Sequence, residues 1–231
     1  MYYPIKNMQY KNLISFVLIA LIALSSCQKD SFDHDLPVID GNVALNIISD
    51  YRKPNNARNE PDYIFTDAKI ALDEITFLQK DTSNSNAHFE GPFICDLIEN
   101  TTTPQLPYGN IEVGHYQLFQ LDIVEHLENN LSIDIYGNYH PNGVVIHPFH
   151  YSSTLEETVT ILQQVGIDIV QDSLHQVAII VDLAAIFDDI DYESVHYEED
   201  GFLDFNADEN TVHHEGITNR FMESFRVHQV R

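Results

Sequence analysis

Three histidines lie close together around a predicted turn in the middle of the chain. His140 precedes Pro141-Asn142-Gly143, and His147 and His150 follow it. Because Asn-Gly between apolar runs is typical of a β-hairpin, His140 could meet His147 or His150 across two strands. Imidazoles on facing strands suit Cu²⁺ or Zn²⁺, so the pattern predicts a candidate copper or zinc site. Histidines at the rim of a sheet are the alternative.

A second candidate site is a carboxylate-rich stretch between residues 188 and 215. Its candidate calcium ligands are Asp200, Asp204 and Asp208, because calcium takes oxygen ligands. Residues 206–210 alternate oxygen-bearing side chains as an EF-hand loop does, but the glycine that such a loop requires is missing. A solvated acidic loop is the alternative interpretation.

Catalytic patterns are absent from the sequence. It has no Gly-x-Ser-x-Gly, no phosphate-binding glycine loop and no His-Glu-x-x-His. Cys95 lies in the apolar run Phe93–Ile98, which favours a core cysteine rather than a nucleophile. We therefore expect a non-enzymatic protein, and a hydrolase with an unrecognised site is the alternative.

The N-terminus carries a different chemical signal. Lys6 and Lys11 precede an apolar run of about a dozen residues that ends in Leu24-Ser25-Ser26-Cys27. The run is shorter than the roughly 20 residues that span a bilayer. Small residues before a cysteine are typical of a bacterial lipoprotein signal peptide, so residues 1–26 are predicted to be removed and Cys27 to carry the lipid, including palmitate.

A charged linker follows the predicted lipidation site. Residues 27–41 contain Lys29, Asp30, Asp33 and Asp35 and lack any hydrophobic period, which predicts a flexible tether. The acidic residues resemble the export signal of surface lipoproteins of Bacteroidota. The resemblance implies an outer-membrane protein that is anchored by lipid and faces the cell surface, with the periplasmic face as the alternative.

The charge balance restricts the partners. The chain has 36 acidic and 11 basic residues and a formal net charge of −25, which becomes −27 once Lys6 and Lys11 are removed. Nucleic-acid binding requires basic clusters, so we expect no nucleic-acid partner. The expected partners are the membrane, through the lipid on Cys27, and an unidentified protein or glycan.

Short runs rich in Val, Ile, Phe and Tyr and bounded by Asn, Pro and Gly fill most of the remaining chain. They predict a mainly β protein, an antiparallel β-sandwich of about seven or more strands with small C-terminal helices. The predicted domain covers residues 42–231. Its expected strands are Val43–Ile48, Ala68–Leu78, Phe93–Ile98, one from His115, Leu131–Tyr136, Val144–Ile146, Val159–Val170 and a central His175–Asp182.

The pattern changes near residue 182, where helical additions are expected to begin. Leu183, Ile186, Phe187 and Ile190 recur at helical spacing. A second helix is expected after Asn210 as N-cap, with Ile217, Phe221 and Phe225 on one face. The Pro-interrupted residues 101–109 are expected to form a loop. These patterns place the strands first and the helices last.

Two segments carry a wider family resemblance. Glu90-Gly91-Pro92-Phe93 leads to Asp96-Leu97, and Gly114-His115-Tyr116 opens the next predicted strand. This layout resembles transthyretin-like (prealbumin-like) lipoprotein domains of unknown function in Bacteroidota and, more distantly, the methanobactin-partner copper-binding proteins. The resemblance implies a β-sandwich over residues 42–190. The copper-binding relatives use tryptophan-bearing sites, and this chain has no tryptophan, so no ligand is carried over.

Overall fold

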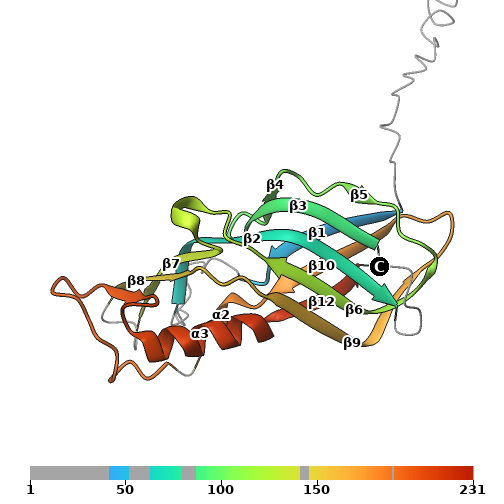
Figure 1. The fold of residues 1–231 in the computed structure, drawn as a ribbon. Helices are drawn as coiled ribbons and strands as arrows, with labels where there is room; N and C mark the ends of the chain where they lie inside the picture. The colour runs from blue at the N-terminus through green and yellow to red at the C-terminus, as the bar shows by residue number, and fades with distance from the viewer. Residues whose placement is uncertain (1–41, 52–62, 80–86, 141–145, 189, 231) are drawn as a thin grey trace, which may run out of the picture. The chain divides into compact units, whose positions relative to one another are not determined.

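Alternating and continuous apolar runs form two β-sheets that pack face to face (Figure 1). The structure is a computed structural model that describes residues 42–51, 63–79, 87–140, 146–188 and 190–230. The strands are β1 (Val43–Ser49), β2 (Tyr63–Gln79), β3 (Ala87–Asp96), β4 (Thr101–Thr103), β5 (Tyr108–Gly109), β6 (Gly114–Ile123), β7 (Ile133–Tyr139), β8 (His147–Ser153), β9 (Thr158–Ile169), β10 (His175–Val181), β11 (Leu203–Phe205) and β12 (Phe225–Val230). The helices are η1 (Glu128–Asn130), α2 (Leu183–Ile186) and α3 (Thr211–Glu223).

The smaller sheet has the strand order β12-β10-β1-β5. The predicted β10 is central in it, because β1 and β12 flank it. Val177, Ile179 and Val181 alternate along one face of β10 and are all buried. The β1–β10 pair is parallel, as is the β8–β11 pair, whereas the other pairs are antiparallel. The predicted β-sandwich is therefore confirmed, with mixed rather than purely antiparallel pairing.

The larger sheet is organised by the long strand β2. Its N-terminal half pairs with β7, from Tyr63 to Ile70, and its C-terminal half pairs with β6 as far as Gln79. The order β11-β8-β7 continues from the first half, and β9 joins β6 beyond the second half. The two halves of β2 thus support different groups of strands, one at each end of the sheet.

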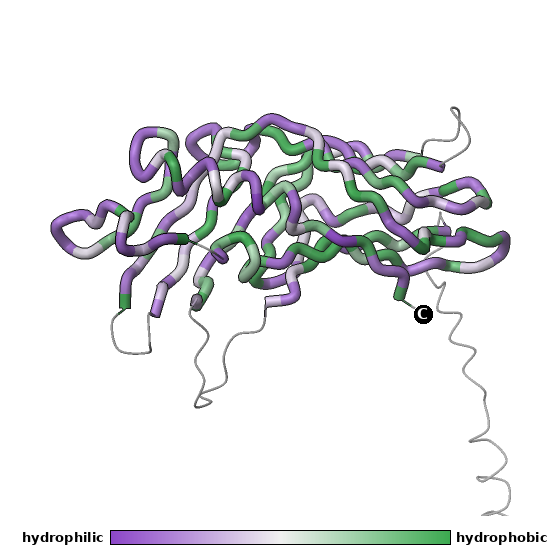
Figure 2. Tube along the Cα trace, turned by 90° about the horizontal axis from the view of Figure 1, so that it is seen from below, coloured by the Kyte–Doolittle hydropathy of each residue, from purple (hydrophilic) through white to green (hydrophobic). Residues whose placement is uncertain are grey.

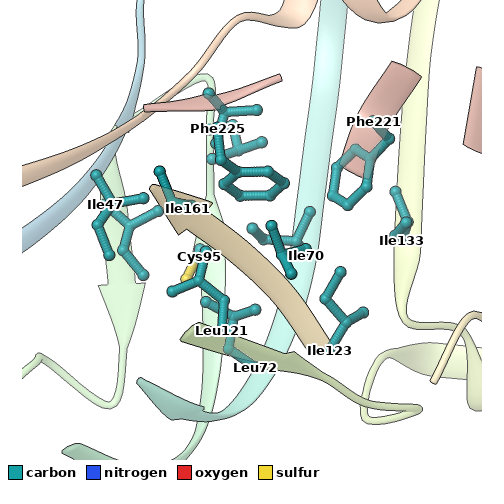
Figure 3. Packing of buried hydrophobic residues seen from close by; sticks show 14 of the residues in the cluster. Ile47, Ile70, Leu72, Cys95, Leu121, Ile123, Ile133, Ile161, Phe221 and Phe225 are labelled. Atoms are coloured by element: carbon teal, nitrogen blue, oxygen red, sulfur yellow. The ribbon is translucent and has the colours of Figure 1, made fainter. Parts of the chain in front are cut away.

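The core lies between the sheets and extends under the helices. Figure 3 shows Ile47 of β1, Cys95 of β3, Ile161 of β9 and Phe221 of α3 among the side chains of one buried cluster. All four are buried. Burying apolar surface contributes about 25 cal/mol per Å², so this shared cluster is the main source of stability that holds the sheets together.

The helices cover the β7–β8 half of the large sheet. Phe187, just after α2, packs on Phe149 of β8 with ring centroids 4.9 Å apart. Tyr151 of β8 forms a hydroxyl hydrogen bond with Thr218 of α3 at 2.8 Å. The Arg220 side chain donates to the Ile186 carbonyl at 2.9 Å and links the two helices. No helix in the described ranges is long and apolar enough to cross a membrane.

Several sequence expectations differ from the structure. Residues 101–109 include the short strands β4 and β5, because only residues 104–107 lie outside a ladder. The expected strand 144–146 falls largely outside the described residues, and β8 begins at His147 despite Pro148. Strands β11 and β12 follow the first helix, so the expected order of strands before helices is wrong.

The second predicted helix is confirmed with two differences. α3 begins after Asn210 and buries Ile217 and Phe221, as expected. Asn210, however, has a left-handed φ of 50° and makes no side-chain cap bond. Phe225 lies in β12, because the helix ends at Glu223 and the chain turns at Ser224.

Candidate functional site

The three predicted histidines have different surroundings. His140 follows β7 and is 8% exposed, and its Nε2 has no hydrogen-bond partner in the described part of the chain. His147 and His150 are three residues apart on β8, so their side chains lie on opposite faces. The His147 ring lies 4.9 Å from the Tyr197 ring, whereas the His150 ring stacks on Tyr136 at 4.2 Å.

His150 instead lies between two carboxylates. Its Nε2 is 2.7 Å from Asp134 Oδ1 on β7, and its Nδ1 is 3.4 Å from Asp204 Oδ1 on β11. His150 exposes 17% of its side chain and each aspartate exposes 23%. Because both ring nitrogens face carboxylates, His150 is engaged in linking three strands rather than free to bind a metal with His147.

Asp204 also belongs to a cluster of acidic side chains. Oxygens of Glu198, Asp204 and Glu209 all lie within 4.8 Å of one another, and among the described residues no other group of three potential ligands approaches this closely. Asp204 Oδ1 is buried from solvent and accepts no hydrogen bond from any residue that the structure describes. Of the six predicted metal ligands, only Asp204 is in this cluster.

Asp200 and Asp208 lie nearby but have other roles. Asp200 Oδ1 accepts a hydrogen bond from the Phe202 backbone N–H at 3.0 Å, and Asp208 is exposed. The sequence placed Glu198 and Glu209 in the acidic stretch without identifying them as ligands. No local spacing marks them, because they come together only through the folding of the loop around β11.

Side-chain amides fix that loop. Asn210 accepts from the His196 N–H at 2.7 Å and donates to the carbonyls of His196 and Asp204 at 3.0 and 2.8 Å. Asn206 Oδ1 accepts from the backbone N–H groups of Asp208 and Glu209, both at 2.8 Å. These bonds hold the chain on both sides of the carboxylate cluster. Three carboxylates favour a hard cation such as Ca²⁺ over copper or zinc.

A serine–histidine pair lies close to the same loop. Ser194 Oγ is 3.1 Å from His213 Nε2, which is the contact that a hydrolase would use. Ser194 Oγ, however, donates its proton to the Asp191 carbonyl at 2.9 Å. The hydroxyl proton is thus directed away from the histidine, so the geometry gives no activated nucleophile here.

The predicted cysteines have separate outcomes. Cys95 is fully buried in β3, as expected, and burial raises the pKa of its thiol to about 12. A thiol with so high a pKa is a poor nucleophile near neutral pH. Cys27 lies outside the described residues, so its lipidation stays a prediction.

A separate concave surface lies where the described chain begins. A hollow of about 530 Å³ is lined by Asn42, residues 110–113 and residues 171–174. Asn42 is fixed there by both ends of its amide, since Nδ2 donates to the Ile111 carbonyl at 2.6 Å and Oδ1 accepts from the Ile111 N–H at 2.8 Å. Its backbone also pairs with Gly109 and His175.

The chain was compared with family models, curated proteins and solved structures. No family model matches it, and neither a curated protein nor a solved structure does. The function is therefore argued from the chain's own residues.

Proposed function

We propose that this chain is a lipid-anchored extracytoplasmic protein whose β-sandwich serves as a non-enzymatic binding or accessory module on the outer-membrane surface. The observation that carries the proposal is the sequence Leu24-Ser25-Ser26-Cys27 after a short apolar run. The sandwich begins at Val43, shortly after the predicted lipidation site, and supplies the module. Its partner is a protein or glycan, because the acidic surface opposes nucleic acid.

The anchor is tested by acylation and location. In bacteria fed a labelled palmitate analogue, the wild-type chain is expected to become labelled and Cys27→Ala to lose the label. Cys95→Ala is the matched control and should keep it, because Cys95 is buried in the sandwich. External protease on intact cells should digest the protein. Labelling that survives in Cys27→Ala contradicts the anchor, and resistance to protease contradicts the outward-facing location.

A second candidate function is binding of a divalent cation. The observation that favours it is the approach of Glu198, Asp204 and Glu209 to within 4.8 Å. Three neighbouring carboxylates repel one another, and a cation such as Ca²⁺ would relieve that repulsion. The predicted copper or zinc site at His140, His147 and His150 gains no such support, because His147 and His150 face different sides of β8.

The cation proposal is tested by thermal melting of the mature protein in detergent. Ca²⁺ is expected to raise the melting temperature, because a ligand that binds only the folded state stabilises it, by about 2.7 kcal/mol at 100 times its Kd. Glu209→Gln should remove most of the shift. Glu199→Gln, at an exposed position outside the cluster, is the control and should keep it. Equal Ca²⁺-induced shifts in the melting temperature of both variants would show that Ca²⁺ binds outside the carboxylate cluster.

A further inference from the structure

The carboxylate cluster and Asn42 lie at opposite ends of the sandwich, and exposed apolar side chains occur at both, with Ile146 61% exposed at the first. The carboxylate cluster lies beside β11, which joins β8 and β7 on the N-terminal half of β2. Asn42 lies at the other end, where β5 pairs with the start of β1 and where Gly114, the first residue of β6, lies next to Gln79, the last residue of β2. Figure 1 shows the β11 loop and the start of β1 at opposite ends of the two sheets. In Figure 2 the loop at the β11 end is mainly hydrophilic.

Apolar side chains are exposed at the Asn42 end. Val113 and Leu174 line the same hollow as Asn42 and are 59% and 45% exposed. Val170, at the end of β9, is 49% exposed, and its backbone N–H donates to the ring of His175, which starts β10. We name Val113, Val170 and Leu174 the apolar rim. Among the described residues that line the hollow, Glu112 and Asp172 are the acidic ones.

We propose that the apolar rim lies against the lipid surface that holds the acyl chains of Cys27. This inference rests on the proposed anchor. Fourteen residues separate Cys27 from Asn42, and they span at most about 50 Å. The chain therefore enters the domain beside the rim, at a residue fixed by four hydrogen bonds. Of the two ends of the sandwich, the rim end is therefore the one that the chain from Cys27 reaches first.

Two physical effects support this orientation. Half-exposed Val and Leu side chains lose contact with water when they enter the interfacial region of a bilayer. Three of them are too few to hold the domain on a membrane from solution, but an anchor on the same chain supplies a high local concentration. The acidic end would be repelled by an anionic surface, and this orientation points it, with the carboxylate cluster, away from the lipid.

Fluorescent labelling at single cysteines tests the orientation. Val113→Cys and Leu174→Cys place a label on the rim, and Ile146→Cys, 61% exposed before β8, is the matched control at the other end. Wild-type Cys95 is buried and should stay unlabelled. The acylated protein is reconstituted into phosphatidylcholine vesicles that carry a spin-labelled lipid as quencher. We expect several-fold stronger quenching at 113 and 174 than at 146.

The outcomes separate the inference from the proposed anchor. Acylated, vesicle-bound protein with equal quenching at 113 and 146 overturns the orientation and leaves the anchor intact. The label at 113 could instead be shielded already in dilute detergent, in a protein of twice the monomer mass. That result would assign the rim to a contact with a second copy of the chain and would also overturn the orientation. Protein that is not acylated overturns the anchor and the orientation together.

Discussion

His150 and Asp204 lie directly opposite each other in the parallel register of β8 and β11. Their facing atoms, Nδ1 and Oδ1, are 3.4 Å apart, and Asp134 approaches the other ring nitrogen at 2.7 Å. A histidine between two carboxylates joins β7, β8 and β11 through side chains as well as through the backbone. The short strand β11, and with it the loop that carries Glu198 and Glu209, is thereby tied to the sheet.

His150→Phe tests this link. Phenylalanine keeps an aromatic ring against Tyr136 but removes both ring nitrogens, which leaves two mostly buried carboxylates without the histidine. We expect the free energy of unfolding to fall by about 1–3 kcal/mol. Urea denaturation measures it. His88→Phe is the control, because His88 and Glu90 form an exposed pair, and its effect should stay within about 0.5 kcal/mol. Similar losses in both variants would contradict the role of His150.

The space around two glycines differs, so we expect the same substitution to have opposite effects on stability. A Cβ at Gly137 of β7 would lie 2.6 Å from the Phe149 ring and 2.8 Å from the Ile64 carbonyl. Gly137→Ala is therefore expected to destabilise the fold by about 1–3 kcal/mol. Gly216 lies inside α3, and a Cβ there meets only the end of Arg220 at 3.6 Å. Gly216→Ala should stabilise by about 0.5–1 kcal/mol. Urea denaturation midpoints that shift in the same direction from wild type in both variants would refute this assignment of close packing.

His214 predicts a loss of stability in mild acid. Burial lowers the pKa of His214 below 6.5, although its hydrogen bond to the Ser152 carbonyl opposes the shift. The unfolded chain therefore binds the proton more readily, so the contribution of His214 is complete above pH 6.5 and is lost as the pH falls through the folded-state pKa. The urea concentration at the unfolding midpoint should be lower at about pH 5 than at about pH 7, and the difference should be smaller in His214→Gln. If the urea midpoint of His214→Gln depended on pH as strongly as that of the wild type, the acid sensitivity would belong to other groups.

Cys95 predicts a slow reaction with thiol reagents. Its pKa of about 12, compared with an ordinary value of 9.0, reduces the thiolate fraction on the order of a thousandfold. Burial adds a steric barrier. The acylated native protein should therefore react with a disulfide reagent far more slowly than the same protein in urea, followed by absorbance. A fast reaction in the native state would mean that β3 opens readily.

The sequence predicted best the elements that a local pattern determines. The run Val177–Val181 is apolar throughout, and a strand buried on both faces has this pattern, so β10 was correctly expected at the centre of a sheet. The period of Ile217 and Phe221 likewise identified α3. β8 was missed because two histidines and Pro148 occupy its first four residues, and neither residue type favours a strand.

The candidate site could be predicted only in part. Asp204 was named from the acidic stretch, but its neighbour His150 is 54 residues away in the sequence and meets it through the β8–β11 pairing. That pairing depends on Leu203 and Phe205, whose buried side chains are the only local sign of a three-residue strand. Contacts between distant segments depend on register, which the composition of either segment does not determine.

The clamp at Asn42 has a mechanical consequence. A pull on the preceding chain first meets four hydrogen bonds, which connect Asn42 to Gly109, Ile111 and His175. Because these partners lie on two separate segments, residues 109–111 and His175, the load divides between them before it reaches the ladder between β1 and β10. Asn42→Ala removes the two amide bonds, so single-molecule pulling from residue 42 should then rupture the sandwich at a lower force. The hydrogen bonds of Asn42 therefore protect the β1–β10 ladder from force at the point where the chain enters the sandwich.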